Sequence, residues 1–219
     1  MIYDFHTHTF LSDGVNSPIE LIRCAHIYGY AAIAITDHVS YSNIDEIIKA
    51  VKKDCQLAEK YWEIKAIPGV EITNVPAKSI NEMAKYAKEC GAVMVAVHGQ
   101  TMVEPVEEGT NFQALSCPYV DLLAHPGLLT DEEANLAVKN DIYIEITRRQ
   151  GHSLSNGLVA QKGIRAGAKL LVNSDSHSHN DLYREGMQRK IALGAGLTEE
   201  QADYIFSNNT QNFLKKILN

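Results

Sequence analysis

Hydrophobic and polar positions follow two alternating patterns along the chain. Short runs of apolar and β-branched residues, typical of buried strands, alternate with longer segments whose apolar positions have the spacing of amphipathic helices. The predicted strands cover residues 2–5, 31–36, 64–70, 92–97, 120–124, 141–147 and 168–173. The predicted helices cover residues 17–29, 43–61, 79–91, 130–140 and 153–167, and the last fifty residues also have a helical pattern.

Several helix ends carry local signals. Ser17 stands where an N-cap belongs, Pro18 occupies the first helical position, and Gly29 follows the last turn. Asn43 is a candidate cap for the next helix. The segment that begins at Ser79 reads Ser-x-x-Glu, which predicts a capping box.

Nearly continuous apolar strands separated by helices predict a parallel sheet covered by helices. This pattern leaves open whether the sheet is doubly wound or closed into a barrel. A doubly wound nucleotide-binding sheet would carry a glycine-rich phosphate loop, and neither GxGxxG nor GxxxxGK[ST] is present. No linker or shift in composition divides the chain, so we expect one domain over residues 1–219.

The composition is that of a globular enzyme, with 219 residues, 45% hydrophobic and 21% charged. A net charge of −7 argues against binding of long nucleic acid, which needs a basic surface. No signal peptide or membrane-length apolar run is visible, so we expect a cytoplasmic protein without a membrane partner. The sequence leaves the oligomeric state open. Four separated cysteines are expected to be reduced thiols: Cys24, Cys55, Cys90 and Cys117.

Imidazoles and carboxylates follow nearly every predicted strand. The first strand leads into His6, His8 and Asp13. The later ones lead into Asp37 and His38, Glu71, His98, His125, and Asp175 and His177. In parallel sheets and barrels the ligand site lies at the carboxyl ends of the strands. Because six of the nine histidines fall at these ends, we expect them to share one site.

The residue types and their spacing predict a metal centre. In extended backbone His6 and His8 lie on one face while Thr7 points away, and Asp175 and His177 repeat this spacing. Imidazole with carboxylate suits Zn²⁺, Mn²⁺ or Fe²⁺ better than Ca²⁺ or Mg²⁺. The number of ligands exceeds the needs of one ion, so we expect two to three divalent transition metal ions. Glu71 is the natural bridge between them.

Six ordered motifs carry a resemblance to a known family. "HTHTFLSDG", "AITDH", "PGVE", "VHG", "AHPG" and "NSDSH" resemble the successive motifs of the PHP (polymerase and histidinol phosphatase) family, over essentially the whole chain. The resemblance implies a distorted, TIM-like (β/α)7 barrel, a trinuclear metal centre and phosphoesterase activity. It therefore favours the barrel, which the periodicity alone leaves open.

The resemblance also implies how the ligands are shared. His6, His8, Glu71 and Asp175 would surround one metal, and Glu71 would bridge to a second held by His98 and His125. Asp13, His38 and His177 would hold the third, with Asp13 standing where some members have histidine. Glu71, Asp175 and His177 are also the expected catalytic residues.

The expected function is hydrolysis of a small phosphomonoester, histidinol-phosphate-like or nucleotide-like, by a metal-bridging hydroxide. The expected partner is therefore a small phosphorylated metabolite. Three alternatives remain open: a phosphodiesterase or exonuclease on short nucleotides, a deaminase or amidohydrolase, and a non-catalytic metal-binding regulatory module.

Residues between the motifs have open roles. Arg148 and Arg149 are candidate phosphate ligands through paired N–H donors, and His152 is either a substrate contact or a solvated loop residue. Asp37 either orients His38 or caps a loop. The long segment after His98, which bears three glutamates, either covers the site and selects the substrate or is a solvated loop.

Overall fold

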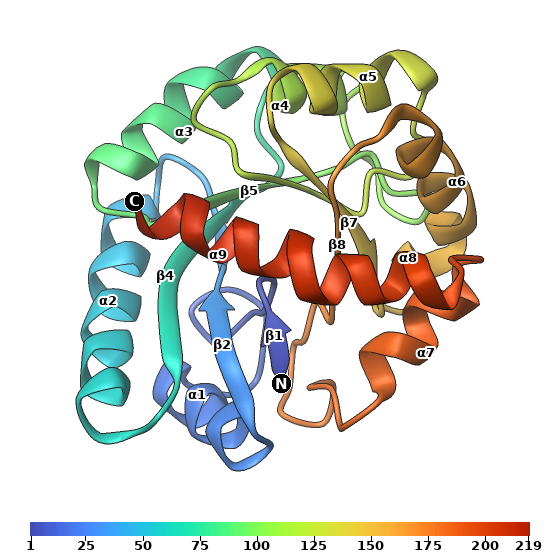
Figure 1. Ribbon diagram of the computed structural model, residues 1–219. Helices are drawn as coiled ribbons and strands as arrows, with labels where there is room; N and C mark the ends of the chain where they lie inside the picture. The colour runs from blue at the N-terminus through green and yellow to red at the C-terminus, as the bar shows by residue number, and fades with distance from the viewer.

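The computed structural model describes residues 1–219 and alternates strands with helices (Figure 1). The strands are β1 (Ile2–Asp4), β2 (Tyr30–Ile35), β3 (His38–Val39), β4 (Lys65–Ile72), β5 (Met94–His98), β6 (Leu122–Ala124), β7 (Tyr143–Thr147) and β8 (Leu170–Asn173). The α-helices are α1 (Pro18–Ile27), α2 (Ile44–Tyr61), α3 (Ile80–Glu89), α4 (Thr110–Ser116), α5 (Asp131–Lys139), α6 (Asn156–Ala166), α7 (Met187–Gly194), α8 (Glu199–Tyr204) and α9 (Thr210–Leu218). Two 3₁₀ turns, η1 (Ala77–Ser79) and η2 (His152–Ser155), and a π-helical turn, η3 (Ile205–Asn209), complete the set.

All strand pairs are parallel, in the order β1-β2-β4-β5-β6-β7-β8. The short β3 also pairs with β4 and so extends the line of β2 beyond Asp37. The strand order follows the chain, so each helical connection joins neighbouring strands. This arrangement confirms the predicted parallel sheet.

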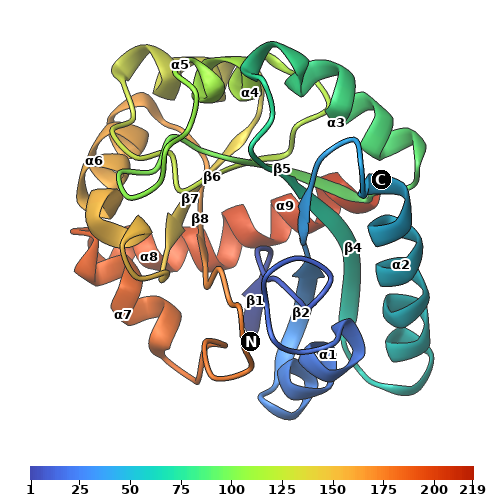
Figure 2. The same cartoon turned by 180° about the vertical axis from the view of Figure 1, so that it is seen from behind.

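The sheet curves until its first and last strands meet. The backbone N–H of His8 donates to the carbonyl of Ser176 at 2.7 Å, and Thr7 forms an isolated parallel bridge with Ser176. The N–H of Phe5 donates to Oδ1 of Asn173 at 3.1 Å. The result is a nearly closed seven-stranded barrel with helices outside, which confirms the TIM-like (β/α)7 fold (Figures 1 and 2).

The C-terminal helix α9 crosses one end of the barrel (Figure 1). Its Phe213 is fully buried, with ring centroids 4.8 Å from Phe5 and 4.7 Å from Tyr143. In the adjoining η3, Asn209 donates to the carbonyl of Leu170 at 3.0 Å, at the start of β8. This end is therefore the floor of the barrel, and the carboxyl ends of the strands lie at the other.

Two of the predicted helix caps are wrong, although the helices themselves form. Asn43 makes no cap bond, because its Oδ1 accepts from the N–H of Ser40 instead. Ser79 lies in η1 and donates to Pro76, so the expected capping box is absent. Ser17 does cap α1, by accepting from the N–H of Glu20. No helix combines the length and the apolar composition that a membrane crossing requires.

Candidate metal centre

Side chains from all around the rim converge at the carboxyl ends of the strands. His6, His8 and Glu71 are fully buried, whereas Asp13 is 51% exposed and His38 is 25% exposed. The centre therefore has a deep part inside the barrel and a shallow part open to solvent. The sequence prediction that these strand ends meet at one rim agrees with this arrangement.

Glu71 lies in the middle of this set. Its Oε1 is 3.4 Å from Nε2 of both His6 and His125, and its Oε2 is 2.8 Å from Nδ1 of His38. The carboxylate thus reaches the deep histidines with one oxygen and the shallow side with the other. This position is the one expected of a bridging carboxylate.

The candidate ligands form overlapping groups whose atoms lie within 4.8 Å of one another. His8, Asp13, His38 and His177 form the shallow group, in which Asp13 lies 3.0 Å from Nε2 of His177. The deep groups are His6 with Glu71 and His125, His6 with His8 and Asp175, and His125 with His152 and Asp175. A further group joins His98 to Glu104 and His152. Thus His98 lies with Glu104, where the resemblance had grouped it with Glu71.

Two of the buried imidazoles, those of His6 and His98, are oriented by hydrogen bonds from their outer nitrogens. His6 Nδ1 donates to Oε1 of Glu145 at 2.8 Å, which leaves Nε2 facing the centre, 3.0 Å from Nε2 of His8. His98 Nδ1 donates to the carbonyl of Gly99 at 3.1 Å. Metal-binding histidines typically hold their second nitrogen in this way.

Several buried polar atoms in the centre have no hydrogen-bond partner. They are His8 Nδ1, Glu71 Oε1, His125 Nδ1, His152 Nδ1 and Asp175 Oδ2. Buried polar groups are normally paired because leaving one unpaired costs about 1–3 kcal/mol. Two unpaired carboxylate oxygens among imidazole nitrogens suit bound divalent cations, so the residues present fit a metal centre.

Carboxylates and imidazoles in the centre shift one another's pKa values toward their charged forms. Burial alone would lower the pKa of His6, but the carboxylates of Glu145, Glu71 and Asp175 hold it well above its usual value. Burial would raise the pKa of Glu71, but His6 and His38 hold it well below its usual value. Burial lowers the pKa of His8 to about 3, so this imidazole is neutral and has a lone pair available for a cation.

Asp175 has an unusual backbone conformation. Asp175 has φ 53°, in the left-handed region that aspartate tolerates better than most residues. An aspartate there provides both the backbone turn and the carboxylate.

Asp37 accepts from the N–H and hydroxyl of Thr9 and from the hydroxyl of Ser12, so it caps the loop after β1. The structure thus supports the loop-capping alternative for Asp37.

Sequence reasoning missed Glu145 on β7. It is fully buried, and besides His6 it accepts from the side-chain N–H of Asn173 at 2.9 Å and from the backbone N–H of His125 at 3.1 Å. A carboxylate within the apolar run "IYIEIT" was the available signal. A buried strand holds a charge only where partners are provided.

Sequence reasoning also missed Glu104, in the loop after β5. Its carboxylate lies 3.0 Å from Nε2 of His98 and 3.2 Å from Nε2 of His152. His152 is only 8% exposed, and its Nδ1 is 3.4 Å from Asp175. His152 therefore belongs to the centre and is not a solvated loop residue.

A polar pocket of about 410 Å³ opens beside Asp175. It is lined by Arg148, Arg149, Gln150, Ser174, Asp175 and Asp181. The guanidinium of Arg148 donates to the backbone carbonyl of Asp181 and lies 3.7 Å from its carboxylate. Arg149 has no carboxylate within ion-pair distance, so its guanidinium remains available to an anion.

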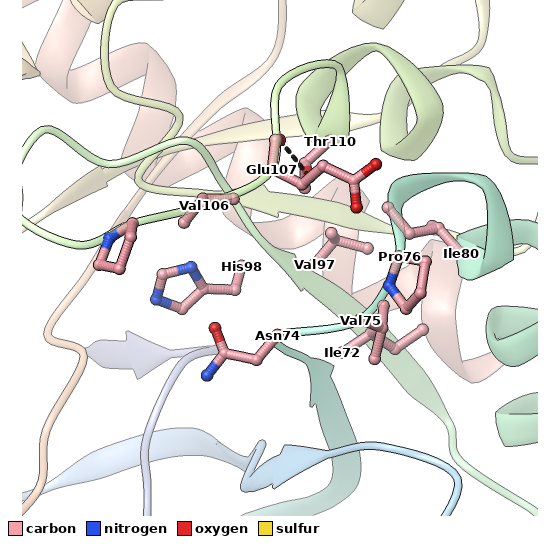
Figure 3. Close-up of a pocket in the computed structure, with 11 residues that line it drawn as sticks. Ile72, Asn74, Val75, Pro76, Ile80, Val97, His98, Val106, Glu107 and Thr110 are labelled. Atoms are coloured by element: carbon pink, nitrogen blue, oxygen red, sulfur yellow. Dashed lines mark hydrogen bonds between the residues drawn. The ribbon is translucent and has the colours of Figure 1, made fainter.

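A second pocket, of about 320 Å³, lies on the other side of the rim and includes His98 (Figure 3). The imidazole of His98 and the amide of Asn74 lie on one side, with Pro76 and Ile80 on the other. Apolar side chains form much of its wall, and its lining contains no arginine, lysine, phenylalanine, tyrosine or tryptophan. We call this the apolar pocket.

Comparison with known proteins shows which family has this fold and these motifs. Residues 4–116 match the PHP domain. An uncharacterized protein of Methanocaldococcus jannaschii is 46% identical over 218 residues, covering 99% of this chain and 100% of that protein. A protein of Thermoanaerobacter sp. named as a probable phosphatase is 28% identical over 218 residues, covering 91% of this chain and 89% of that relative.

The solved structure of a proposed histidinol phosphatase from Listeria monocytogenes has the same fold. Its TM-score is 0.62 at 12% identity, covering 85% of this chain and 99% of that chain. The barrel fold, the histidines and carboxylates at its rim, and the family match together define the class of this protein as a metal-dependent phosphoesterase. The chain belongs to the PHP family, as its ordered motifs predicted.

Proposed function

We propose that this protein is a phosphatase that hydrolyses a small phosphomonoester, using two to three divalent ions held by the rim residues. The observation that carries the proposal is the position of Glu71, whose two oxygens face histidines on opposite sides of one buried centre. The proposed ligands are His6, His8, Asp13, His38, Glu71, His98, His125, Asp175 and His177. Zn²⁺, Mn²⁺ and Fe²⁺ suit this donor set.

Bound at such a centre, divalent ions lower the pKa of water and offset the negative charge of a phosphoryl group. The chain's own residues prepare the site for them. The bond from His6 Nδ1 to Glu145 fixes the ring so that Nε2 is the nitrogen that faces the centre. Burial keeps His8 uncharged, which leaves it able to act as a ligand.

The two pockets give the substrate an orientation across the centre. Arg149, beside Asp175, would hold phosphate oxygens through paired N–H donors. The apolar pocket beside His98 would receive the alcohol part of the ester. Its volume lies at the lower end of the range for small-molecule sites, about 300–1,000 Å³.

The lining of the apolar pocket supports a compact monoester over a nucleic acid. It has no lysine or arginine for a second phosphate, and no phenylalanine, tyrosine or tryptophan on which a base could stack. The net charge of −7 points the same way. We therefore propose a small phosphorylated metabolite as the partner and no long nucleic acid.

The test is hydrolysis of para-nitrophenyl phosphate and of its bis-ester by protein purified with its metals, with Mn²⁺ or Zn²⁺ added. We expect turnover of the monoester and little of the bis-ester. Preferential cleavage of the bis-ester would replace the phosphatase by a phosphodiesterase. Hydrolysis of neither by metal-loaded protein would favour a non-catalytic metal-binding module. If the monoester is hydrolysed, a screen of phosphorylated metabolites would identify the natural substrate.

A further inference from the structure

The loop between β5 and α4 places one carboxylate over the centre. Glu104 is 51% exposed, yet its two oxygens contact two buried histidines of different elements. Oε2 lies 3.0 Å from Nε2 of His98, at the end of β5, and Oε1 lies 3.2 Å from Nε2 of His152, in η2. All three residues offer ligand atoms within 4.8 Å of one another.

Both histidines present Nε2 to this point, and their Nδ1 atoms face other groups. His98 Nδ1 donates to the carbonyl of Gly99, and His152 Nδ1 faces Oδ2 of Asp175 at 3.4 Å. Metal-binding histidines usually have an outer nitrogen facing a backbone carbonyl or a carboxylate. Ligands about 2.0–2.2 Å from a tetrahedral ion lie roughly 3.4 Å from one another, close to the separations around Glu104.

The burial of His152 is a second, independent indication of a ligand. The residue is 92% buried by its 8% exposure, and its Nδ1 has no hydrogen-bond partner. An imidazole closed off in this way needs a partner that compensates for its lost hydration. A cation on Nε2 would compensate for that loss at the ring, and it would favour the proton on Nδ1, where the carboxylate of Asp175 faces it at 3.4 Å.

The same loop forms a wall of the apolar pocket. Pro105, Val106 and Glu107 follow Glu104 directly and line the pocket (Figure 3). Glu107 is anchored at the far side, because its Oε2 accepts from the backbone N–H of Ala77 at 3.1 Å. The loop is therefore held at two points, one at η1 and one at the centre.

We propose that Glu104 and His152 complete the ligand set of the ion at His98, and that this ion thereby fixes the loop that walls the apolar pocket. The inference rests on the proposed metal centre, and it adds two ligands from outside the strand-end motifs. The ion at His98 is then bound partly by a carboxylate from an exposed loop, and its binding shapes the place where the alcohol part of the substrate binds.

The experiment compares the full chain with Glu104→Ala and His152→Asn, and uses Glu108→Ala as the matched control from the same exposed loop. Each protein is stripped with a chelator and titrated with Zn²⁺ and separately with Mn²⁺, with bound metal counted by elemental analysis. Hydrogen exchange of residues 101–109 is measured with and without metal. Circular dichroism checks that each variant is folded.

We expect both variants to bind one ion at least about tenfold more weakly, as loss of ligand support does elsewhere. Metal should slow exchange in the loop of the wild type and of Glu108→Ala, but not in that of Glu104→Ala. Equal metal affinity and equal exchange in wild type and Glu104→Ala would overturn the inference and leave the centre intact. Failure of the wild type to bind either metal would overturn the proposed function itself.

Discussion

Nδ1 of His6 donates to Oε1 of Glu145 at 2.8 Å, and both side chains are completely buried. This pair fixes which nitrogen of His6 faces the centre. Glu145→Gln keeps the shape of the side chain but removes its charge. Because outer partners of this kind support metal binding about 10–100-fold, we expect a loss of that size in affinity or turnover.

Titration of stripped Glu145→Gln with Zn²⁺ measures this effect, and Glu46→Gln on the exposed face of α2 is the control. The fold should survive, since the amide can still accept from Asn173. A variant with wild-type metal affinity would show that the pair serves packing alone.

Glu71→Gln should abolish turnover and release at least one ion per chain. The reason is its position between the deep histidines and His38, where a neutral amide is a poor bridge. Elemental analysis of the purified variant, beside activity on para-nitrophenyl phosphate, measures both effects. Unchanged stoichiometry would mean that the bridging assignment is wrong.

Arg149→Ala should raise KM for phosphomonoesters by about 10–100-fold, because hydrogen bonds to charged groups contribute about 1.5–3 kcal/mol. Arg148→Ala should have a smaller effect on KM, since its guanidinium already bonds to Asp181. Steady-state kinetics of the two variants, with inorganic phosphate as a competing inhibitor, separate these roles. If KM is unchanged in Arg149→Ala, this arginine is a solvated surface residue.

Val106→Trp should fill the apolar pocket and raise KM for an aryl phosphate by about tenfold or more, through the loss of apolar burial for the leaving group. Inhibition by inorganic phosphate should stay unchanged, because the proposed phosphate contact, Arg149, lines the other pocket. Val138→Trp, at a half-exposed position of α5, is the control. A parallel loss of phosphate binding would indicate damage to the centre instead of a filled pocket.

Removal of metal should destabilise the folded protein. Binding at a hundred times the dissociation constant contributes about 2.7 kcal/mol, which corresponds to roughly 5–10 °C in Tm for a domain of this size. Thermal unfolding of chelator-treated protein before and after Zn²⁺ or Mn²⁺ measures the shift. A metal-independent Tm would contradict the view that the unpaired carboxylate oxygens of Glu71 and Asp175 face bound cations.

Much of the site was predictable because its residues follow a simple rule. Parallel strands bring their carboxyl ends together, so His98 and His125 could be placed at one rim from the chain pattern alone. Closure of the barrel was different. It depends on contacts such as the one between Phe5 and the side chain of Asn173, which periodicity does not reveal, and the motif resemblance was needed to expect it.

The misses have physical causes. Glu104 lies in a loop whose path is set by distant contacts with His98 and His152, so its distance from the centre has no local signature. Ser79 has the sequence of a capping box, but the preceding turn draws its hydroxyl to Pro76. Glu145 could have been found, because a lone carboxylate in an apolar strand requires partners.

The meeting of the first and last strands has a consequence for biosynthesis. Asp13 and His177 lie in contact although 164 positions separate them, and His8 is tied to Ser176 through the backbone. During translation the amino-terminal ligands leave the ribosome before the carboxyl-terminal ligands have been synthesised. A nascent chain therefore cannot assemble the complete centre until the segment after β8 has left the ribosome, and full metal loading follows the closing of the barrel.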